Sequence, residues 1–329
     1  MDLKTTYLGL ELANPIMLGA CPIAGDLDIL RQLEDAGCAG VVLPSLFEEE
    51  ILAAVHAHME MEAQGAGFAE AQSYLPNPDG YHVGPDEYLE LVADAKKAVS
   101  MPVIGSLNGT TPGGWTDYAK KIEDAGADAL ELNIYVLPFD IAESGEDVEQ
   151  HAVEVVRTVK DSVSIPVAVK LSPFYSSLPH FANKLVDVGA DGLVRGDRFY
   201  QPDLDIEELD VLPNLRLSTA DELRLRLRWL AVLSGQLDVS LACTGGAHNA
   251  VDVLKAVMTG AHAVQLVSAL LIHGPDHIGR LLEAIQFWMS EHEYESIRQM
   301  QGSMNLANVP KPKAFARANY MRMLDSWQQ

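Results

Sequence analysis

Eight short apolar runs, separated by amphipathic segments, constrain the fold of this 329-residue chain more than any other feature of its sequence. The runs are rich in Val, Ile and Leu and lack strict apolar–polar alternation, which indicates strands buried on both faces of a parallel sheet. They are Pro15–Ala20, Gly40–Leu43, Pro102–Leu107, Ala129–Ile134, Pro166–Leu171, Gly192–Arg195, Val239–Thr244 and Ala263–Ser268. Helical patterns lie between them, for example over Asp26–Ala36, Asp86–Val99, Thr116–Ala125 and Asp147–Val163. This alternation predicts an α/β fold, a (β/α)₈ TIM barrel, with a doubly wound open sheet as the alternative.

A short motif that occurs twice supports the barrel. Val99-Ser-Met-Pro-Val103 recurs as Val163-Ser-Ile-Pro-Val167, and each copy begins a predicted strand. Each is then followed by a helix that closes on Gly126-Ala-Asp128 or Gly189-Ala-Asp191. A glycine directly after a helix supplies the left-handed conformation that turns the chain into the next strand. The motif therefore predicts a repeated strand–helix unit.

Two segments are too long for a minimal barrel. Residues 44–84 follow the second strand and contain a helical acidic pattern over Phe47–Gln64, so we expect an inserted excursion that acts as a lid or a dimer contact. The barrel is expected to span residues 1–288 and a C-terminal helical tail residues 289–329. The basic stretch Lys311–Arg322 of that tail predicts a docking helix, with a solvated tail as the alternative.

The charge balance argues against two classes of partner. The chain has 23 Lys and Arg against 47 Asp and Glu, a formal charge of −24, and such a surface repels nucleic acid and anionic lipid. No apolar run reaches the ~18 residues that a membrane span needs, and the N-terminus does not resemble a signal peptide. Cys21, Cys38 and Cys243 are few, scattered and odd in number. We expect a reduced, cytoplasmic protein.

Two loops at the end of the predicted barrel form a candidate phosphate site. Thr244-Gly245-Gly246 follows the seventh strand and Val267-Ser268 follows the eighth. The loops after these two strands are the usual phosphate site of a (β/α)₈ barrel, because they expose backbone N–H groups. A tight turn without a ligand is the alternative.

Lys170 is the second candidate, because it interrupts an otherwise apolar strand. A lysine there would lie inside the barrel mouth and would need an anionic partner or a function. It could stabilise negative charge on a bound ring, and an ion pair with Glu131 on the neighbouring strand is the alternative. Asn108 and Asn133 end two adjacent strands, where they could hydrogen-bond a planar heterocycle or simply serve as turn residues.

These residues resemble the dihydroorotate dehydrogenase family, closest to its cytosolic first class. The similar segments are Asn14–Ala20, Leu75–Asn77, Glu131–Asn133, Val169–Leu171, Thr244–Gly246 and Gln265–Ser268. Members of the family are FMN-containing (β/α)₈ barrels that convert dihydroorotate to orotate in pyrimidine biosynthesis. The resemblance implies that Ala20 passes beside the flavin and that Lys170 contacts the ring near N1 and O2. It also implies that Asn133 touches flavin and substrate, that Asn77 belongs to the substrate site, and that the last two segments hold the FMN phosphate.

The sequence departs from the family in the half of the site that handles orotate. Val136 stands where the first class has its catalytic Cys, and Pro138 stands where a second Asn grips orotate. The Ser base of the second class is also absent, and Pro44 replaces a Lys after the second strand. Cys21 and Asp140 are candidate replacement bases, with a packed loop thiol and a solvated turn residue as the respective alternatives.

The sequence is compatible with three functions. The first is an FMN-dependent oxidoreductase that acts on a CH–CH bond of a small molecule, with Lys170 and one of Cys21 or Asp140 as catalytic residues. The second is a catalytically silent FMN-binding or interaction subunit of a larger redox assembly, which the absence of a base at Val136 favours. The third is a flavin-free phosphosugar barrel. No metal site is expected, because His56 and His58 would point apart on a helix. A homodimer or a redox partner protein is compatible with the sequence.

Overall fold

The structure, a computed structural model, describes residues 1–54, 84–111, 116–134, 136–196, 202–212, 214–315 and 319–326. Eight parallel strands close into a barrel in the order β11-β12-β3-β4-β5-β6-β7-β8. They are β3 (Ile16–Leu18), β4 (Val41–Phe47), β5 (Val103–Asn108), β6 (Ala129–Asn133), β7 (Val167–Leu171), β8 (Gly192–Arg195), β11 (Ser240–Thr244) and β12 (Ala263–Leu266). Every predicted apolar run contributes one strand, so the TIM barrel is confirmed and the open sheet is excluded.

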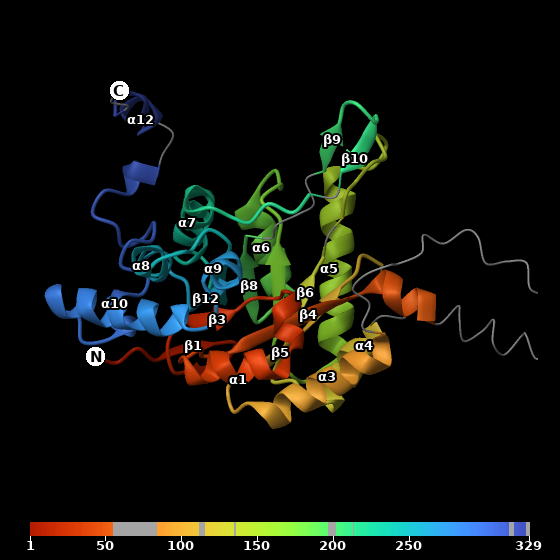
Figure 1. The fold of residues 1–329 in the computed structure, drawn as a ribbon. Helices are drawn as coiled ribbons and strands as arrows, with labels where there is room; N and C mark the ends of the chain where they lie inside the picture. Colours follow the sequence, from red (N-terminus) through yellow and green to blue (C-terminus); the bar gives the residue numbers. More distant parts are fainter. Residues whose placement is uncertain are drawn as a thin grey trace, which may run out of the picture.

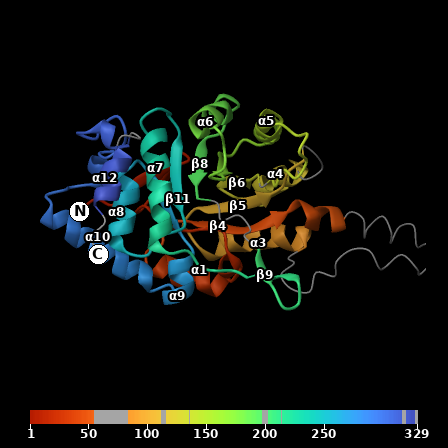
Figure 2. The same ribbon diagram turned by 90° about the horizontal axis from the view of Figure 1, so that it is seen from above.

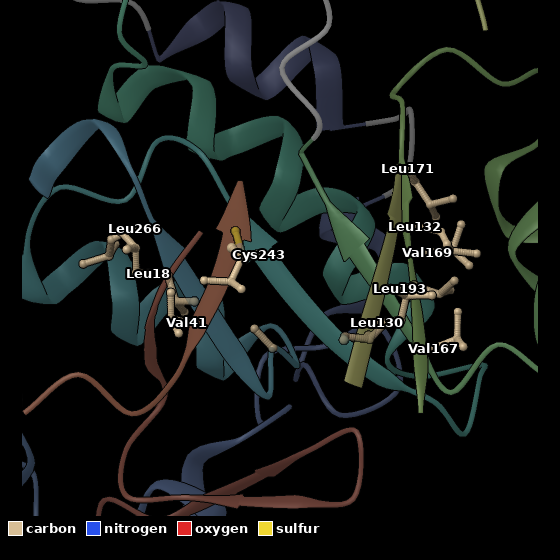
Figure 3. Close-up of a cluster of buried hydrophobic side chains, with 14 of the residues drawn as sticks. Leu18, Val41, Leu130, Leu132, Val167, Val169, Leu171, Leu193, Cys243 and Leu266 are labelled. Atoms are coloured by element: carbon tan, nitrogen blue, oxygen red, sulfur yellow. The ribbon is translucent and has the colours of Figure 1, made fainter. Parts of the chain in front are cut away.

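Helices surround the barrel (Figures 1 and 2). They are α1 (Leu27–Asp35), α3 (Pro85–Ala98), α4 (Thr116–Asp124), α5 (Gly145–Ser162), α6 (Leu178–Asp187), α7 (Leu223–Leu233), α8 (Ala250–Met258), α9 (Ser268–His273) and α10 (His277–Glu291). Their apolar faces and the outward side chains of the strands form the larger buried cluster, part of which is drawn in Figure 3. None of the described helices is long and apolar enough to cross a membrane.

A second, smaller cluster fills the barrel interior. An N-terminal hairpin, β1 (Thr5–Tyr7) and β2 (Leu10–Leu12), contributes Tyr7, Leu8 and Leu12 to it, together with small strand residues such as Ala129 and Ala168. A Cβ placed on the first residue of β8, Gly192, would lie 2.4 Å from Leu8 Cδ2. The hairpin, which was not predicted from the sequence, therefore packs tightly against the barrel interior.

The repeated Gly-Ala-Asp motif has a structural explanation. Asp128 accepts a hydrogen bond from the first backbone N–H of β5 and pairs with Lys96 of α3, at 2.7 Å in each case. Asp191 makes the same two contacts with the first N–H of β7, at 2.8 Å, and with Lys160 of α5, at 2.7 Å. The preceding glycine has a positive φ in both copies, as predicted. Each aspartate thus ties one strand to its neighbour and to a helix.

The strand β4 is longer than predicted. It continues through Pro44 to Phe47, so the excursion begins later than residue 44, and residues 48–54 are helical. Pro44 has no N–H to give to a ladder, and the pairing with β5 shifts register before Ser45. The hydroxyl of Tyr88 compensates, because it accepts from Ser106 N (2.8 Å) and donates to Ser106 O (3.1 Å).

The C-terminal region divides into a packed part and an exposed part. Residues 302–306 donate backbone hydrogen bonds to α7 and α8, and α11 (Ile297–Met300) buries Ile297 and Met300. By contrast, η4 (Pro312–Phe315) and α12 (Asn319–Asp325) lie apart from the strands (Figure 1). A hairpin of β9 (Asp203–Asp205) and β10 (Asp210–Leu212), also not predicted, projects beyond the barrel. The division into a barrel of residues 1–288 and a tail stays a prediction.

Candidate functional site

A cavity of about 670 Å³ opens at the carboxyl ends of the barrel strands. Five residues that the sequence singled out line it together: Ala20, Cys21, Asn108, Asn133 and Lys170. They come from four different strand ends, which lie far apart in the sequence. Barrel closure therefore assembles the predicted site, at the end of the barrel where enzymes of this fold carry out their chemistry.

Strand register places three of these side chains in one row. Asn108 of β5 pairs with Asn133 of β6, which pairs with Lys170 of β7. The same parity along the strands puts all three on the inner side of the barrel. The Asn133 Oδ1 atom is buried and has no hydrogen-bond partner among the described residues. A buried amide oxygen without a partner is costly, so this position suits a ligand that carries an N–H group.

Lys170 forms the ion pair with Glu131 that the sequence suggested as its alternative role, and it also lines the cavity. Its Nζ lies 3.5 Å from an oxygen of Glu131, whose side chain is 1% exposed. The other oxygen of Glu131 accepts a hydrogen bond from Gln265 Nε2 at 2.7 Å. The lysine is therefore held by a buried carboxylate beneath the cavity floor. The two roles are compatible, because one ammonium group can face both partners.

Cys21 follows β3 and lies at the start of η1 (Pro22–Gly25). Burial raises the pKa of its thiol to about 11, although the N–H groups of Ala24 and Ile23 and the charge of Lys170 act in the opposite direction. The thiol is consequently protonated at neutral pH. In that state Cys21 can donate a proton but is a poor base.

Two carboxylates at the cavity were not predicted from the sequence. Asp26 lines it while capping α1, where it accepts hydrogen bonds from Asp28 N and Ile29 N. Glu50 lines it from the helix of residues 48–54 and accepts from Phe47 N at 2.9 Å. The helix-start position of Asp26 was visible in the sequence. Its position beside the cavity depends on how η1 folds back toward β4.

The predicted phosphate residues form a second cluster. The Gly246 N–H donates to Ser218 Oγ at 3.1 Å, and Ser218 Oγ lies 2.9 Å from Ser268 Oγ. Gly246 has a φ of +86°, and a Cβ there would lie 2.6 Å from Leu223 N, so no other residue fits without rearrangement. Three polar groups therefore converge at this point. Ser218 was not predicted from the sequence as a residue of the site.

Two buried arginines flank this cluster. Arg226 of α7 donates from Nε to Thr244 O at 3.0 Å, and a Cβ on Gly245 would lie 2.9 Å from its Nη2. Arg195 of β8 is 1% exposed and donates to Ser172 O at 2.8 Å. Burial, with a smaller contribution from Arg226, lowers the pKa of Arg195 to about 10. Their positive charge favours an anion at the adjacent loops. Neither arginine was predicted from the sequence as a residue of the site.

The cavity and the phosphate cluster lie on adjoining strands. The barrel order β11-β12-β3 places the loop of Thr244 and the loop of Ser268 next to the end of β3. A Cβ on Gly19 would lie 3.0 Å from Val267 Cγ2, so the chain segments leaving β3 and β12 are in contact. Small residues at Gly19 and Ala20 leave the backbone accessible to a flat ligand.

Asp140 and Val136 are not among the described residues that line the cavity, and Asn77 falls outside the described part of the chain. Asp140 is exposed, accepts from Ala142 N at 2.8 Å within its own turn, and is not among the described lining residues. Val136 packs partly buried against the larger core cluster. Asn77, together with His56 and His58, lies outside the described residues. Asp140 and Asn77 therefore stay predictions.

Comparison with known proteins agrees with the motifs of the site. The sequence model of the family described as Dihydroorotate dehydrogenase matches residues 75–289. The dihydroorotate dehydrogenase B (NAD(+)) catalytic subunit of Methanocaldococcus jannaschii is 28% identical over 300 residues, covering 88% of this chain and 94% of that protein. The catalytic subunit of the same name from Thermoplasma volcanium is 27% identical over 306 residues, 92% of this chain and 98% of that protein. The catalytic subunit of the same name from Methanosarcina mazei is 28% identical over 308 residues, which cover 91% of this chain and 94% of that protein.

Proposed function

The chain belongs to the dihydroorotate dehydrogenase family, and from that premise we propose that it is an FMN-dependent oxidoreductase acting on a CH–CH bond of a small ring (EC 1.3 class). The observation that carries this proposal is the cavity that gathers Ala20, Asn108, Asn133 and Lys170 at the carboxyl ends of the strands. Enzymes on this barrel place their chemistry at that edge. The region of residues 1–288 would be the flavin-binding unit.

The residues present fit FMN. The unpartnered Asn133 Oδ1 is matched by a ring N–H, and Lys170 supplies positive charge beside the ring. The phosphate would be held at the Gly246 N–H and the Ser268 hydroxyl, with Thr244, Gly245 and Val267 shaping the loops. It would replace the Ser218 hydroxyl as the acceptor at Gly246 N. The arginines beside these loops favour the phosphate dianion electrostatically.

Bound flavin would supply the hydride transfer, and the protein supplies position, charge and protons. Lys170 would stabilise negative charge on the ring, while Glu131 and Gln265 hold the ammonium group in place. Cys21 is the titratable thiol at the cavity, so it is the candidate to move a proton to or from substrate carbon. Because its thiol is protonated at neutral pH, this arrangement favours proton donation, that is, reduction of a double bond.

A partner protein would exchange electrons with the flavin. The relatives from three organisms are named catalytic subunits of an NAD(+)-dependent enzyme. By analogy we infer that this chain also works with a redox partner in the cytoplasm, as a homodimer or as part of a larger assembly. A catalytically silent FMN-binding subunit is the second candidate function, and Val136 at the position of the family base supports it.

The first test is the visible spectrum, followed by a reaction with dihydroorotate. The full chain, purified or reconstituted with FMN, should show oxidised-flavin absorbance. A protein that retains no flavin would contradict the proposal. The remaining hypothesis would then be a flavin-free barrel that binds a phosphosugar. On anaerobic mixing with excess dihydroorotate, bleaching should be slow, because a general base is typically worth about 10²–10⁴-fold and Val136 cannot serve. Bleaching within seconds would contradict the assigned loss of the base.

A further inference from the structure

A shift of register in β4 decides which side chains at its carboxyl end face the cavity. Before the shift, Val42 lies opposite Ile104, and both side chains belong to the cluster in the barrel interior. Because side chains alternate along a strand, an unbroken β4 would also turn Leu46 inward and Phe47 outward. The shift before Ser45 gives β4 one residue more than β5, which reverses the alternation for the rest of the strand.

The observed burial agrees with this reversal. Leu46 is 1% exposed and packs in the larger cluster between strands and helices, whereas Phe47 is 44% exposed and lines the cavity. Phe47 lies opposite Asn108 and so extends the row of inward side chains by one strand. Its ring contacts no other aromatic ring of the described chain. The ring is therefore available to a ligand in the cavity.

The cavity wall beside Phe47 is apolar and lies apart from the residues assigned to the flavin ring. Pro22 of η1 and Pro44 of β4 line this wall together with Phe47. Asn133 and Lys170 lie on β6 and β7, two and three strands away from β4. Neighbouring strands are about 4.8 Å apart, so roughly 10 Å of sheet separates Phe47 from Asn133. A flavin held at Asn133 and Lys170 would leave the apolar wall to the second ligand, the substrate.

We propose, on the basis of the proposed function, that Phe47 determines specificity by stacking on the substrate ring and thereby favours a planar, unsaturated ring. Aromatic pairs gain affinity beyond the burial of area, equivalent to about two- to tenfold. Saturation of a ring double bond makes two ring atoms tetrahedral, so the puckered ring loses this contact. Cys21 supports the same direction, because a protonated thiol at the cavity suits reduction of the unsaturated ring.

Two matched pairs of ligands test the preference. Uracil and 5,6-dihydrouracil carry the same polar groups and differ in the planarity of the ring. Phenol and cyclohexanol differ in the same way and carry no amide. Each compound is titrated into the FMN-loaded full chain, with perturbation of the flavin absorbance as the readout. In at least one pair the planar member should bind about two- to tenfold more tightly than the puckered one.

Variants of Phe47 attribute the preference to its ring. Phe47→Leu keeps an apolar side chain but removes the ring, so it should weaken the planar ligand about two- to tenfold and leave the puckered one unchanged. Phe47→Tyr keeps a ring and should keep the preference. Phe287→Leu is the control, because Phe287 is 69% exposed on α10 and is not among the described residues that line the cavity.

The outcomes separate this inference from the proposed function. A protein that binds no FMN overturns the proposed function and the inference with it. If FMN is bound, the inference alone is overturned when no planar ring binds, when both pairs bind without preference, or when Phe47→Leu keeps the preference. Fluorescence titration with FMN completes the set. A loss of FMN affinity in Phe47→Leu with an unchanged ligand preference would place Phe47 against the flavin and not against the substrate.

Discussion

At the scale of single residues, Lys170 joins a buried ion pair to the cavity in which the proposed flavin ring would lie. Lys170→Ala in the FMN-bound protein should lower the flavin midpoint potential by about 30 mV, since ~1.4 kcal/mol of lost charge stabilisation corresponds to that shift for a two-electron couple. Glu131→Gln should move the potential the other way, because it removes the opposing charge at 3.5 Å. Potentiometric titration measures both. Equal potentials in all three proteins would make Lys170 purely structural.

The thiol of Cys21 makes a prediction about pH. Burial raises its pKa to about 11, so the reactive thiolate is scarce at neutral pH and increases as pH approaches that value. Alkylation by iodoacetamide, followed by mass spectrometry of the Cys21 peptide, should be slow at pH 7 and accelerate steadily up to the limit of stability. Cys38 and Cys243 are internal references, because burial also raises the pKa of their thiols, to about 11 for Cys38 and to about 12 for Cys243. A rate plateau below pH 8 would contradict the assignment.

The residues of the site differ in how well the sequence could predict them. Lys170 and Asn133 were predictable because a polar residue in an apolar strand stands out and strand register fixes its direction. Ser218 and Arg226 were not, because their contacts with Gly246 and Thr244 join chain segments whose pairing only the closed barrel defines. Arg226 also occupies an ordinary helical position among other arginines, where the pattern predicts a surface residue.

At the scale of elements, the loops after β11 and β12 should control retention of the cofactor. Ser268→Ala removes one hydroxyl from the phosphate cluster and should weaken FMN binding about 5–10-fold, as expected for a lost hydrogen bond of about 1 kcal/mol. Ser290→Ala is the control, because Ser290 is exposed on α10. Fluorescence titration of the apoprotein with FMN measures both affinities. If Ser268→Ala binds FMN as the parent does, the phosphate lies elsewhere.

The repeated aspartates should matter for stability rather than for flavin binding. Asp191→Ala leaves the first N–H of β7 without its acceptor and removes the contact with Lys160. We expect a loss of about 1–2 kcal/mol in the free energy of unfolding, most of it from the hydrogen bond, because the ion pair is partly exposed. Asp128→Ala should cost a similar amount. Urea denaturation measures the loss, and a change below 0.5 kcal/mol, roughly the effect of an ordinary surface substitution, would exclude this role.

Helices with regular patterns and strands within apolar runs were predictable, and the short strands of the two hairpins were not. Helices such as α1 and α4 match their predicted bounds within one residue, because caps and periodicity define them. The three-residue strands β1, β2, β9 and β10 are too short to show a period. β4 was predicted too short, because Pro44 normally ends a strand and here Tyr88 supplies the missing ladder contacts.

At the scale of the whole molecule, the count of apolar runs was enough to predict a closed barrel. It could not show which segment covers the end of the barrel where the strands begin. That role belongs to the N-terminal hairpin, whose Leu8 packs against Gly192 nearly two hundred residues away. The charge of the cavity is also a property of the folded whole. Asp26 and Glu50 lie on different elements, and only the folded chain brings both to the cavity that Lys170 lines.

The contacts of Asp128 and Asp191 lie at the amino ends of β5 and β7, whereas the cavity opens at the carboxyl ends of the strands. Each aspartate contacts the first N–H of a strand and a lysine of the helix before that strand, so two consecutive α-β-α-β quarters of the ring are held in the same way. Side chains at the carboxyl ends can therefore change without removing these contacts. The residues that line the cavity and the residues that hold the strands together are separate sets.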